Sequence, residues 1–261
     1  MARKPRRLVI REDEVGVYHV WSRTVRQMWL LGEEVGSGRN YAYRKEWVED
    51  RLGLLTKVYA IDACVYAIMS NHYHLLLRNR PDLVAQMSDE EVVRRWWQLS
   101  PERRGAGGKP AEITVVELQS LLVDRERVAE LRKRLSSISW FMKTLNEWLA
   151  RRANREDGVT GHFVEDRFKC RSLLDEGAIL AASLYIDLNE IRAGLAGTPE
   201  ESRYTAGYRR ILRRVRVGLE RAAAGDVLSE RADWLCPVDE CAREVLLGPE
   251  GAESVVESRL V

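Results

Sequence analysis

Two histidines separated by one residue are the first feature of this sequence that could do chemistry. They are His72 and His74, within the segment 69–77. On a β-strand, residues i and i+2 project from the same face with their Cα atoms about 7 Å apart. Both imidazoles can therefore converge on one metal ion, while Tyr73 points to the opposite face. The other interpretation is a pair of histidines whose ring nitrogens are satisfied by hydrogen bonds at the surface of a sheet.

A second set of polar side chains follows one face of an otherwise apolar segment, residues 177–194. Tyr185, Asn189 and Arg192 stand at positions i, i+4 and i+7, which share a face of an α-helix. A tyrosine hydroxyl, an amide and a guanidinium thus form a polar stripe on an otherwise apolar helix. The alternative is structural: a buried tyrosine ring with its hydroxyl at the rim, and an asparagine that caps or bridges.

A third feature is a basic, extended segment over residues 162–174. Arg167, Lys169 and Arg171 alternate along it, so their side chains project to one side of a strand. This pattern is typical of a solvated face or of contacts with a phosphate backbone.

The elements that must position these residues follow from the hydrophobic periodicity. We expect strands over 15–24, 61–69 and 72–78, the last two joined as a hairpin by Ser70-Asn71, and helices over 41–60, 113–135, 136–153 and 175–192. Ser88 and Glu91 are spaced as a capping box and predict another helix start. The order predicts an α+β fold, an antiparallel sheet with helices on one face. No glycine-rich phosphate loop follows a strand, which excludes P-loop and Rossmann folds.

Charge divides the chain into four parts, although the net charge is only +2. Residues 1–80 carry 14 Lys and Arg against 9 Asp and Glu, and residues 131–216 carry 17 against 11. Residues 81–130 carry 7 against 10, and residues 217–261 carry 4 against 10. We therefore expect one discontinuous domain, 1–80 and 131–216, with a helical acidic insertion at 81–130 and an acidic tail at 217–261.

Several classes of protein are excluded by composition. No apolar run approaches the ~20 residues of a membrane span, and the basic first residues precede no apolar segment of a secretory signal. The cysteines at 64, 170, 236 and 241 show no metal-binding spacing, and a disulfide framework is not expected in a chain of 261 residues. We expect a cytoplasmic protein with no membrane association.

Four segments occur in a fixed order at 18–23, 69–77, 161–169 and 185–194. They read Tyr-His-Val-Trp-Ser-Arg, Met-Ser-Asn-His-Tyr-His-Leu-Leu-Leu, Gly-His-Phe-Val-Glu-Asp-Arg-Phe-Lys and Tyr-Ile-Asp-Leu-Asn-Glu-Ile-Arg-Ala-Gly. In this combination the sequence resembles the single-tyrosine HUH transposases, most closely the REP-associated tyrosine transposases. The resemblance covers roughly residues 10–80 and 135–215.

The resemblance implies a ferredoxin-like antiparallel sheet and metal-dependent cleavage of single-stranded or hairpin DNA by a monomer or homodimer. His72, His74 and Asn189 would bind a divalent ion, Mg²⁺ or Mn²⁺. Tyr185 would be the nucleophile that forms a 5′-phosphotyrosine link and releases a 3′-hydroxyl. The residues expected to contact DNA are Arg23, Arg167, Lys169, Arg171 and Arg192.

One position departs from the family's pattern. Glu190 stands where the family usually has proline after the asparagine, and glutamate favours a continuous helix there. It would either add a carboxylate near the metal or mark a site that has lost its activity. The alternatives are therefore a non-catalytic DNA-binding protein derived from such a transposase, and a metal phosphoesterase with a small substrate.

His19 has two interpretations, packing in the first strand or a role beside the active site, and Trp21 or Trp29 is a candidate for stacking on bases.

Overall fold

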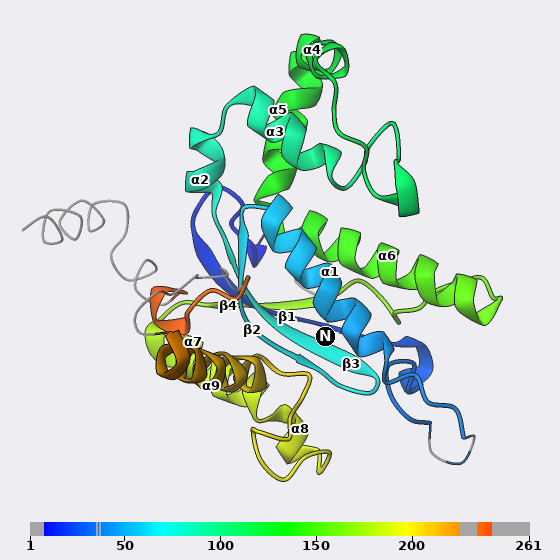
Figure 1. Ribbon diagram of the computed structural model, residues 1–261, viewed down its shortest axis with the longest axis vertical. Coiled ribbons are helices and arrows are strands. Elements are labelled where there is room, and N and C mark those ends of the chain that lie inside the picture. The colour runs from blue at the N-terminus through cyan, green and yellow to red at the C-terminus, as the bar shows by residue number, and fades with distance from the viewer. Residues whose placement is uncertain (1–7, 35, 37, 225–233, 242–261) are drawn as a thin grey trace, which may run out of the picture.

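A four-stranded antiparallel sheet is the centre of the computed structural model, which describes residues 8–34, 36, 38–224 and 234–241, without the side chains of 217–224 (Figure 1). The strand order is β2-β3-β1-β4. The strands are β1 (Gly16–Arg23), β2 (Ile61–Ile68), β3 (His72–Asn79) and β4 (Lys169–Leu173). Helix α1 (Arg44–Val58) connects β1 to β2, and α6 (Ile138–Asp157) precedes β4. This order and orientation make the fold ferredoxin-like, so the predicted α+β class is confirmed.

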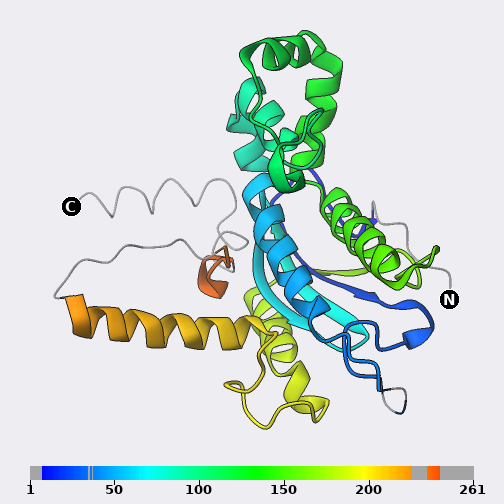
Figure 2. The same cartoon turned by 45° about the vertical axis from the view of Figure 1, so that its right-hand side comes forward.

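Helices α1 and α6 cover one face of the sheet (Figures 1 and 2). Tyr73 points to this face, is buried, and donates its hydroxyl proton to Oδ1 of Asn146 on α6. The Asn146 amide nitrogen in turn donates to Oγ of Ser22 on β1, at 3.2 Å. This short chain of hydrogen bonds satisfies three polar groups between the sheet and α6.

Helices cover the other face as well, so the expectation of helices on one face only is wrong. They are α7 (Glu176–Asp187), α8 (Asn189–Arg192) and α9 (Ala206–Ala224). Every position of β3 after His72 is buried, as expected for a strand with both faces covered. Asp175 caps α7 by accepting from the backbone N–H of Ala178 at 2.8 Å.

The single helix predicted over 175–192 is divided in two. Helix α7 ends at Asp187, and Leu188, with φ −92° and ψ 8°, separates it from α8. The Asp187 carboxylate turns to α9, where it accepts from the N–H of Gly207 at 2.8 Å and from Arg210 at 3.1 Å. A tertiary anchor at this position therefore overrides the helix propensity of the segment.

Four helices lie beyond one end of the sheet (Figures 1 and 2). They are α2 (Pro81–Gln86), α3 (Asp89–Trp97), α4 (Val115–Val123) and α5 (Arg125–Leu135). Ser88 caps α3 by accepting from the N–H of Glu91 at 3.1 Å, as its spacing predicted. The continuous helix predicted over 113–135 is wrong, because Asp124 (φ −82°, ψ 81°) ends α4 and caps α5 with its own carboxylate. Two 3-10 turns, Val25–Gln27 and Ala106–Gly108, complete the regular elements of the described chain.

Strand β2 lies at the edge of the sheet, and two later segments cover its free side. The N–H of Ile68 donates to the carbonyl of Tyr204 at 3.0 Å, and the N–H of Cys236 donates to the carbonyl of Ala63 at 3.0 Å. An edge strand with unpaired backbone groups is a template for wrong pairing, which these contacts prevent.

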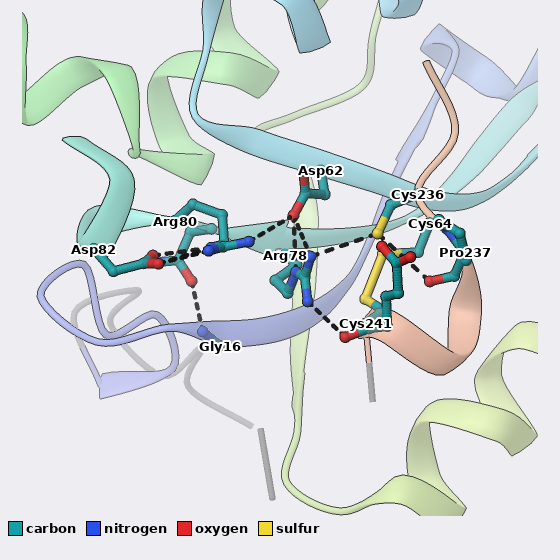
Figure 3. Close-up of polar contacts among 11 residues, drawn as sticks. Gly16, Asp62, Cys64, Arg78, Arg80, Asp82, Cys236, Pro237 and Cys241 are labelled. Atoms are coloured by element: carbon teal, nitrogen blue, oxygen red, sulfur yellow. Dashed lines mark hydrogen bonds and ion pairs between the residues drawn. A yellow bond between two sulfur atoms is a disulfide. The ribbon is translucent and has the colours of Figure 1, made fainter. Parts of the chain in front are cut away.

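The second of these segments, residues 234–241, is also fixed by side chains (Figure 3). Arg78 on β3 is buried; it donates to Asp62 at 2.8 Å and to the carbonyl of Glu240 at 2.7 Å. Cys241 forms a disulfide with Cys64. The sequence-based expectation of no disulfide is therefore wrong; the two cysteines are 177 positions apart, which no local spacing reveals. The remainder of the tail predicted at 217–261 lies largely outside the described residues.

Within the described part of the chain, no helix is both long enough and apolar enough to cross a membrane.

The hydrogen bonds between Tyr73, Asn146 and Ser22 give a stability prediction. Asn146→Leu keeps the branched shape of the side chain but removes the Asn146 acceptor of the Tyr73 hydroxyl, so we expect the free energy of unfolding to fall by about 2 kcal/mol. Urea denaturation followed by circular dichroism measures the change. Adding Tyr73→Phe should recover part of the loss; a double variant less stable than Asn146→Leu would contradict this account.

Candidate active site

The register of the sheet brings most of the predicted site residues to one face. Residues that pair directly across antiparallel strands project from the same side. His72 pairs with Arg23, and His74 pairs with Trp21, which pairs in turn with Lys169 on β4. These side chains therefore lie on the face covered by α7, opposite the face that holds α1 and α6.

A third histidine belongs to the same surface. His19 pairs with Arg171 of β4, and its Nε2 lies 2.9 Å from Nδ1 of His74. The ring centroids of His72 and His74 are 5.0 Å apart, as are those of His19 and His74. Three imidazoles thus form a compact group on two central strands.

The hydrogen bonds of His72 determine its tautomer. Nδ1 of His72 lies 2.7 Å from Oδ1 of Asn71, and the Asn71 amide nitrogen donates to the carbonyl of Gln27 at 3.0 Å. Because the amide oxygen can only accept, His72 is the donor at Nδ1 and its Nε2 carries the lone pair. An outer hydrogen bond of this kind orients metal-binding histidines.

The same logic applies to His74, with an unusual partner. If Nδ1 of His74 donates to Nε2 of His19, the lone pair of His74 lies on its own Nε2, and His19 carries its proton on Nδ1. An imidazole takes the place that a carboxylate or carbonyl oxygen often holds behind a metal ligand.

The environment keeps these three rings neutral at physiological pH. Burial lowers the pKa of His74 to about 3, and the nearby His19, His72 and Arg23 add to the effect. Burial lowers the pKa of His72 to about 4, assisted by Arg23, and the pKa of His19 to about 4, assisted by Arg171. Neutral imidazole is the form that binds a metal ion.

Tyr185 on α7 lies against this group. Its ring centroid is 5.8 Å from that of His74 and 6.1 Å from that of His19. The residue is 42% exposed. The guanidinium of Arg192 lies over the tyrosine ring, 4.6 Å from its centroid. The polar stripe predicted from the sequence is thus preserved across the kink at Leu188.

Asn189 and Glu190, at the start of α8, are both buried. The Asn189 amide nitrogen is enclosed without a hydrogen-bond partner among the described residues. Glu190 forms an ion pair with Lys45 of α1, Oε1 to Nζ 3.2 Å. This carboxylate is therefore engaged with a cation from the opposite layer.

The residues present fit a divalent ion. Nε2 of His72 is available as a ligand because its Nδ1 donates to Asn71, and Nε2 of His74 is available when its Nδ1 donates to His19. The described residues contain no group of three His, Cys, Asp or Glu side chains suited to a metal. The two imidazoles could hold an ion and leave positions for phosphate and water. The Asn189 amide oxygen remains the third ligand expected from the sequence.

The predicted DNA-contacting residues are not all placed alike. Lys169 and Arg171 are exposed on β4, and Arg23 is exposed at the end of β1, all on the histidine face. Arg192 is exposed beside the tyrosine. Arg167 is exposed too, but lies in the irregular segment before β4, outside the paired rows.

Sequence reasoning left two interpretations open for His19 and missed Lys45. The hydrogen bond of His19 to His74 depends on strand register, and the contact of Lys45 with Glu190 joins positions far apart in the chain. The sequence does hold one signal for His19, because it stands next to Tyr18 in the first of the four motifs. Trp21, one candidate for base stacking, is half-buried with its ring 5.0 Å from that of His19, whereas Trp29 is 38% exposed.

Comparison of the chain with protein-family models and with curated proteins found no match. Among solved structures, the fold is similar to that of a REP-associated tyrosine transposase bound to a REP hairpin, with a TM-score of 0.45 and 10% sequence identity. The similarity covers 89% of this chain and 94% of that chain.

The contact between His19 and His74 predicts an effect on metal binding. His19→Phe keeps a ring but removes the acceptor that orients His74, so we expect the affinity for Mn²⁺ to fall by about tenfold or more. Electron paramagnetic resonance of free Mn²⁺ measures the affinity. His162→Ala, at an exposed histidine, is the matched control and should change nothing. Unaltered affinity in His19→Phe would show that His19 does not orient the ligand.

Proposed function

We propose that this protein is a metal-dependent endonuclease and strand transferase that acts on single-stranded or hairpin DNA through a covalent tyrosine intermediate. The observation that carries the proposal is the approach of the exposed Tyr185 ring to within 5.8 Å of the buried His74 ring. His72 shares that face, and exposed cations surround it. A nucleophile, a candidate metal site and a phosphate-binding surface coincide at one place.

The reaction balances without an external energy source. The Tyr185 oxygen attacks a backbone phosphorus and forms an O–P bond with it. The bond from this phosphorus to the 3′-oxygen breaks, so the tyrosine is linked to the 5′-phosphate. The proton lost by the phenol is balanced by one gained at the 3′-oxygen. Attack of a 3′-hydroxyl on the phosphotyrosine reverses the step and joins strands, because the bond energy is conserved in the intermediate.

His72, His74 and Asn189 are the residues that would hold a divalent ion, Mg²⁺ or Mn²⁺. When bound, such an ion takes up charge that develops on the phosphate oxygens. Arg192, stacked on the Tyr185 ring, places a fixed positive charge beside the nucleophile. The phosphate near the tyrosine would therefore meet cationic groups held by α8 and by the sheet.

The surrounding cations would hold the DNA backbone. Lys169 and Arg171 are exposed on β4 in the same paired rows as the histidines, and Arg23 flanks His72. Contacts of this type position a strand without reading its sequence. Arg167 would extend the path only if the strand passes beyond the start of β4.

A covalent adduct is the expected product. The purified protein with a hairpin oligonucleotide carrying a single-stranded extension and Mn²⁺ or Mg²⁺ should give a protein–DNA adduct that survives denaturing electrophoresis. Tyr185→Phe should abolish it, because the attacking oxygen is removed. Chelation of the ion should do the same.

Tyr43→Phe is the matched control, because the Tyr43 side chain is also 42% exposed and belongs to a different layer. It should leave the adduct intact. An adduct that persists in Tyr185→Phe would exclude this nucleophile. Tight binding of the hairpin with no adduct under either ion would favour a non-catalytic DNA-binding protein, and turnover of a nucleotide analogue without an adduct would favour a phosphoesterase.

The exposed cations on β4 lead to a prediction about how DNA affinity depends on salt. Removing two phosphate contacts with Lys169→Ala and Arg171→Ala should weaken binding and reduce the slope of log affinity against log salt by about 1.4 for single-stranded DNA. Fluorescence anisotropy at several salt concentrations measures the slope. Lys143→Ala, exposed on α6 at the opposite face, should leave it unchanged. If the double variant had the same slope as the wild-type protein, β4 would not be part of the DNA-binding surface.

A further inference from the structure

Helix α8 carries a candidate metal ligand on very little intrinsic structure. It spans only Asn189–Arg192, and no side chain caps its start at Leu188. A helix of four residues is not stable by itself in water. Its position must be set by contacts with the rest of the fold.

The strongest side-chain contact of α8 is the ion pair between Glu190 and Lys45. Their charged groups are 3.2 Å apart, and the two side chains are only 6% and 8% exposed. The Lys45 ammonium also lies over the ring of Tyr204, 4.9 Å from its centroid. Lys45 belongs to α1, so the pair connects α8 to the helix layer on the other face of the sheet.

Asn189, the neighbour of Glu190, has no comparable anchor of its own. Its side chain is 9% exposed, and its amide nitrogen has no hydrogen-bond partner in the described part of the chain. The position of this amide therefore follows from the backbone of α8, which is held by its connection to α7 and by the contact of Glu190 with Lys45.

We propose that Glu190 and Lys45 form a positioning pair that holds Asn189 in place for the metal. This inference rests on the proposed function, in which Asn189 is the third ligand. Glu190, one member of this buried pair, stands where the resembling family has a proline after the asparagine. The pair also accounts for Glu190 without a direct metal bond, because its carboxylate is occupied by Lys45.

A double-mutant cycle in metal affinity tests the inference without relying on DNA cleavage. Glu190→Gln keeps the shape of the side chain and removes its charge, and we expect Mn²⁺ affinity to fall by about tenfold, the size of effect seen for groups that orient metal ligands. In an Asn189→Ala background the same change should have little effect, because the ligand it positions is already absent. Electron paramagnetic resonance measures all four proteins.

Glu46→Gln is the matched control. Glu46 is paired with Arg203 at 2.7 Å, which joins the same two regions of the chain, but these side chains are 50% and 64% exposed. We expect its removal to leave Mn²⁺ affinity unchanged. A fall as large as that of Glu190→Gln would show that general docking of the segment matters, and would overturn the specific role of the buried pair.

Loss of one partner of a buried pair can prevent folding, so a second variant is needed. Lys45→Met with Glu190→Met removes both charges and leaves none uncompensated. It should remain folded by circular dichroism and still bind Mn²⁺ about tenfold more weakly. Wild-type affinity in this folded variant would overturn the positioning role.

The outcomes separate the two proposals. If the wild-type protein binds Mn²⁺ and His74→Ala abolishes binding, the metal site stands. Unchanged affinity in Glu190→Gln, or an equal loss with and without Asn189, then refutes only the positioning pair. If His74→Ala leaves Mn²⁺ binding unaltered, the proposed metal site itself is wrong, and the positioning role fails with it.

Discussion

The antiparallel pairing of β1 with its two neighbours is the constraint on which the rest of this structure depends. A shift of one residue in either ladder would transfer every side chain of that strand to the opposite face. The observed register instead places His19 beside His74 and opposite Arg171, so one set of backbone hydrogen bonds assembles both a group of neutral imidazoles and its cationic border. The same alternation sends Tyr73 to the other face, where it bonds to α6.

The two faces of the sheet solve different physical problems. On the face of α6, Tyr73, Asn146 and Ser22 are joined by hydrogen bonds, so they contribute to stability and to a single register. On the face of α7, the Asn189 amide nitrogen is enclosed without a hydrogen-bond partner among the described residues. Such incomplete satisfaction is costly in a core, and it is typical of a place where a ligand supplies the missing partners.

Much of this arrangement could be predicted from local sequence. Alternating β-branched residues located β1, a short polar turn located the hairpin, and Ser88 and Asp175 marked helix starts that the structure confirms. The breaks at Asp124 and Leu188 could not be found in this way, because apolar periodicity continues through both. The first break depends on the Asp124 carboxylate, which accepts from the backbone N–H of Arg127. The second follows Asp187, whose carboxylate accepts from the backbone N–H of Gly207 in α9.

The candidate site likewise divides into residues that local sequence identifies and partners that it does not. Residue types and spacing identified His72, His74 and Tyr185 as candidates, because strand and helix periods are properties of the local chain. The partner of His74 and the partner of Glu190 belong to elements that fold against them from elsewhere in the sequence. Pairing at such distances is decided by tertiary packing. Lys45 therefore carries no local signature as an anchor, and the only local signal for His19 is its place beside Tyr18 in the first motif.

The bond between Cys64 and Cys241 gives the protein a topology that the ribbon alone does not convey. It closes a covalent ring that contains β3, all four helices beyond the sheet end, α6, β4 and the helices that carry Tyr185 and Asn189. A protease that cut the chain once between α3 and α4 would open this ring without releasing a fragment. The two pieces would migrate as one species until a reductant separated them, and both halves of the site would remain tethered in a nicked molecule.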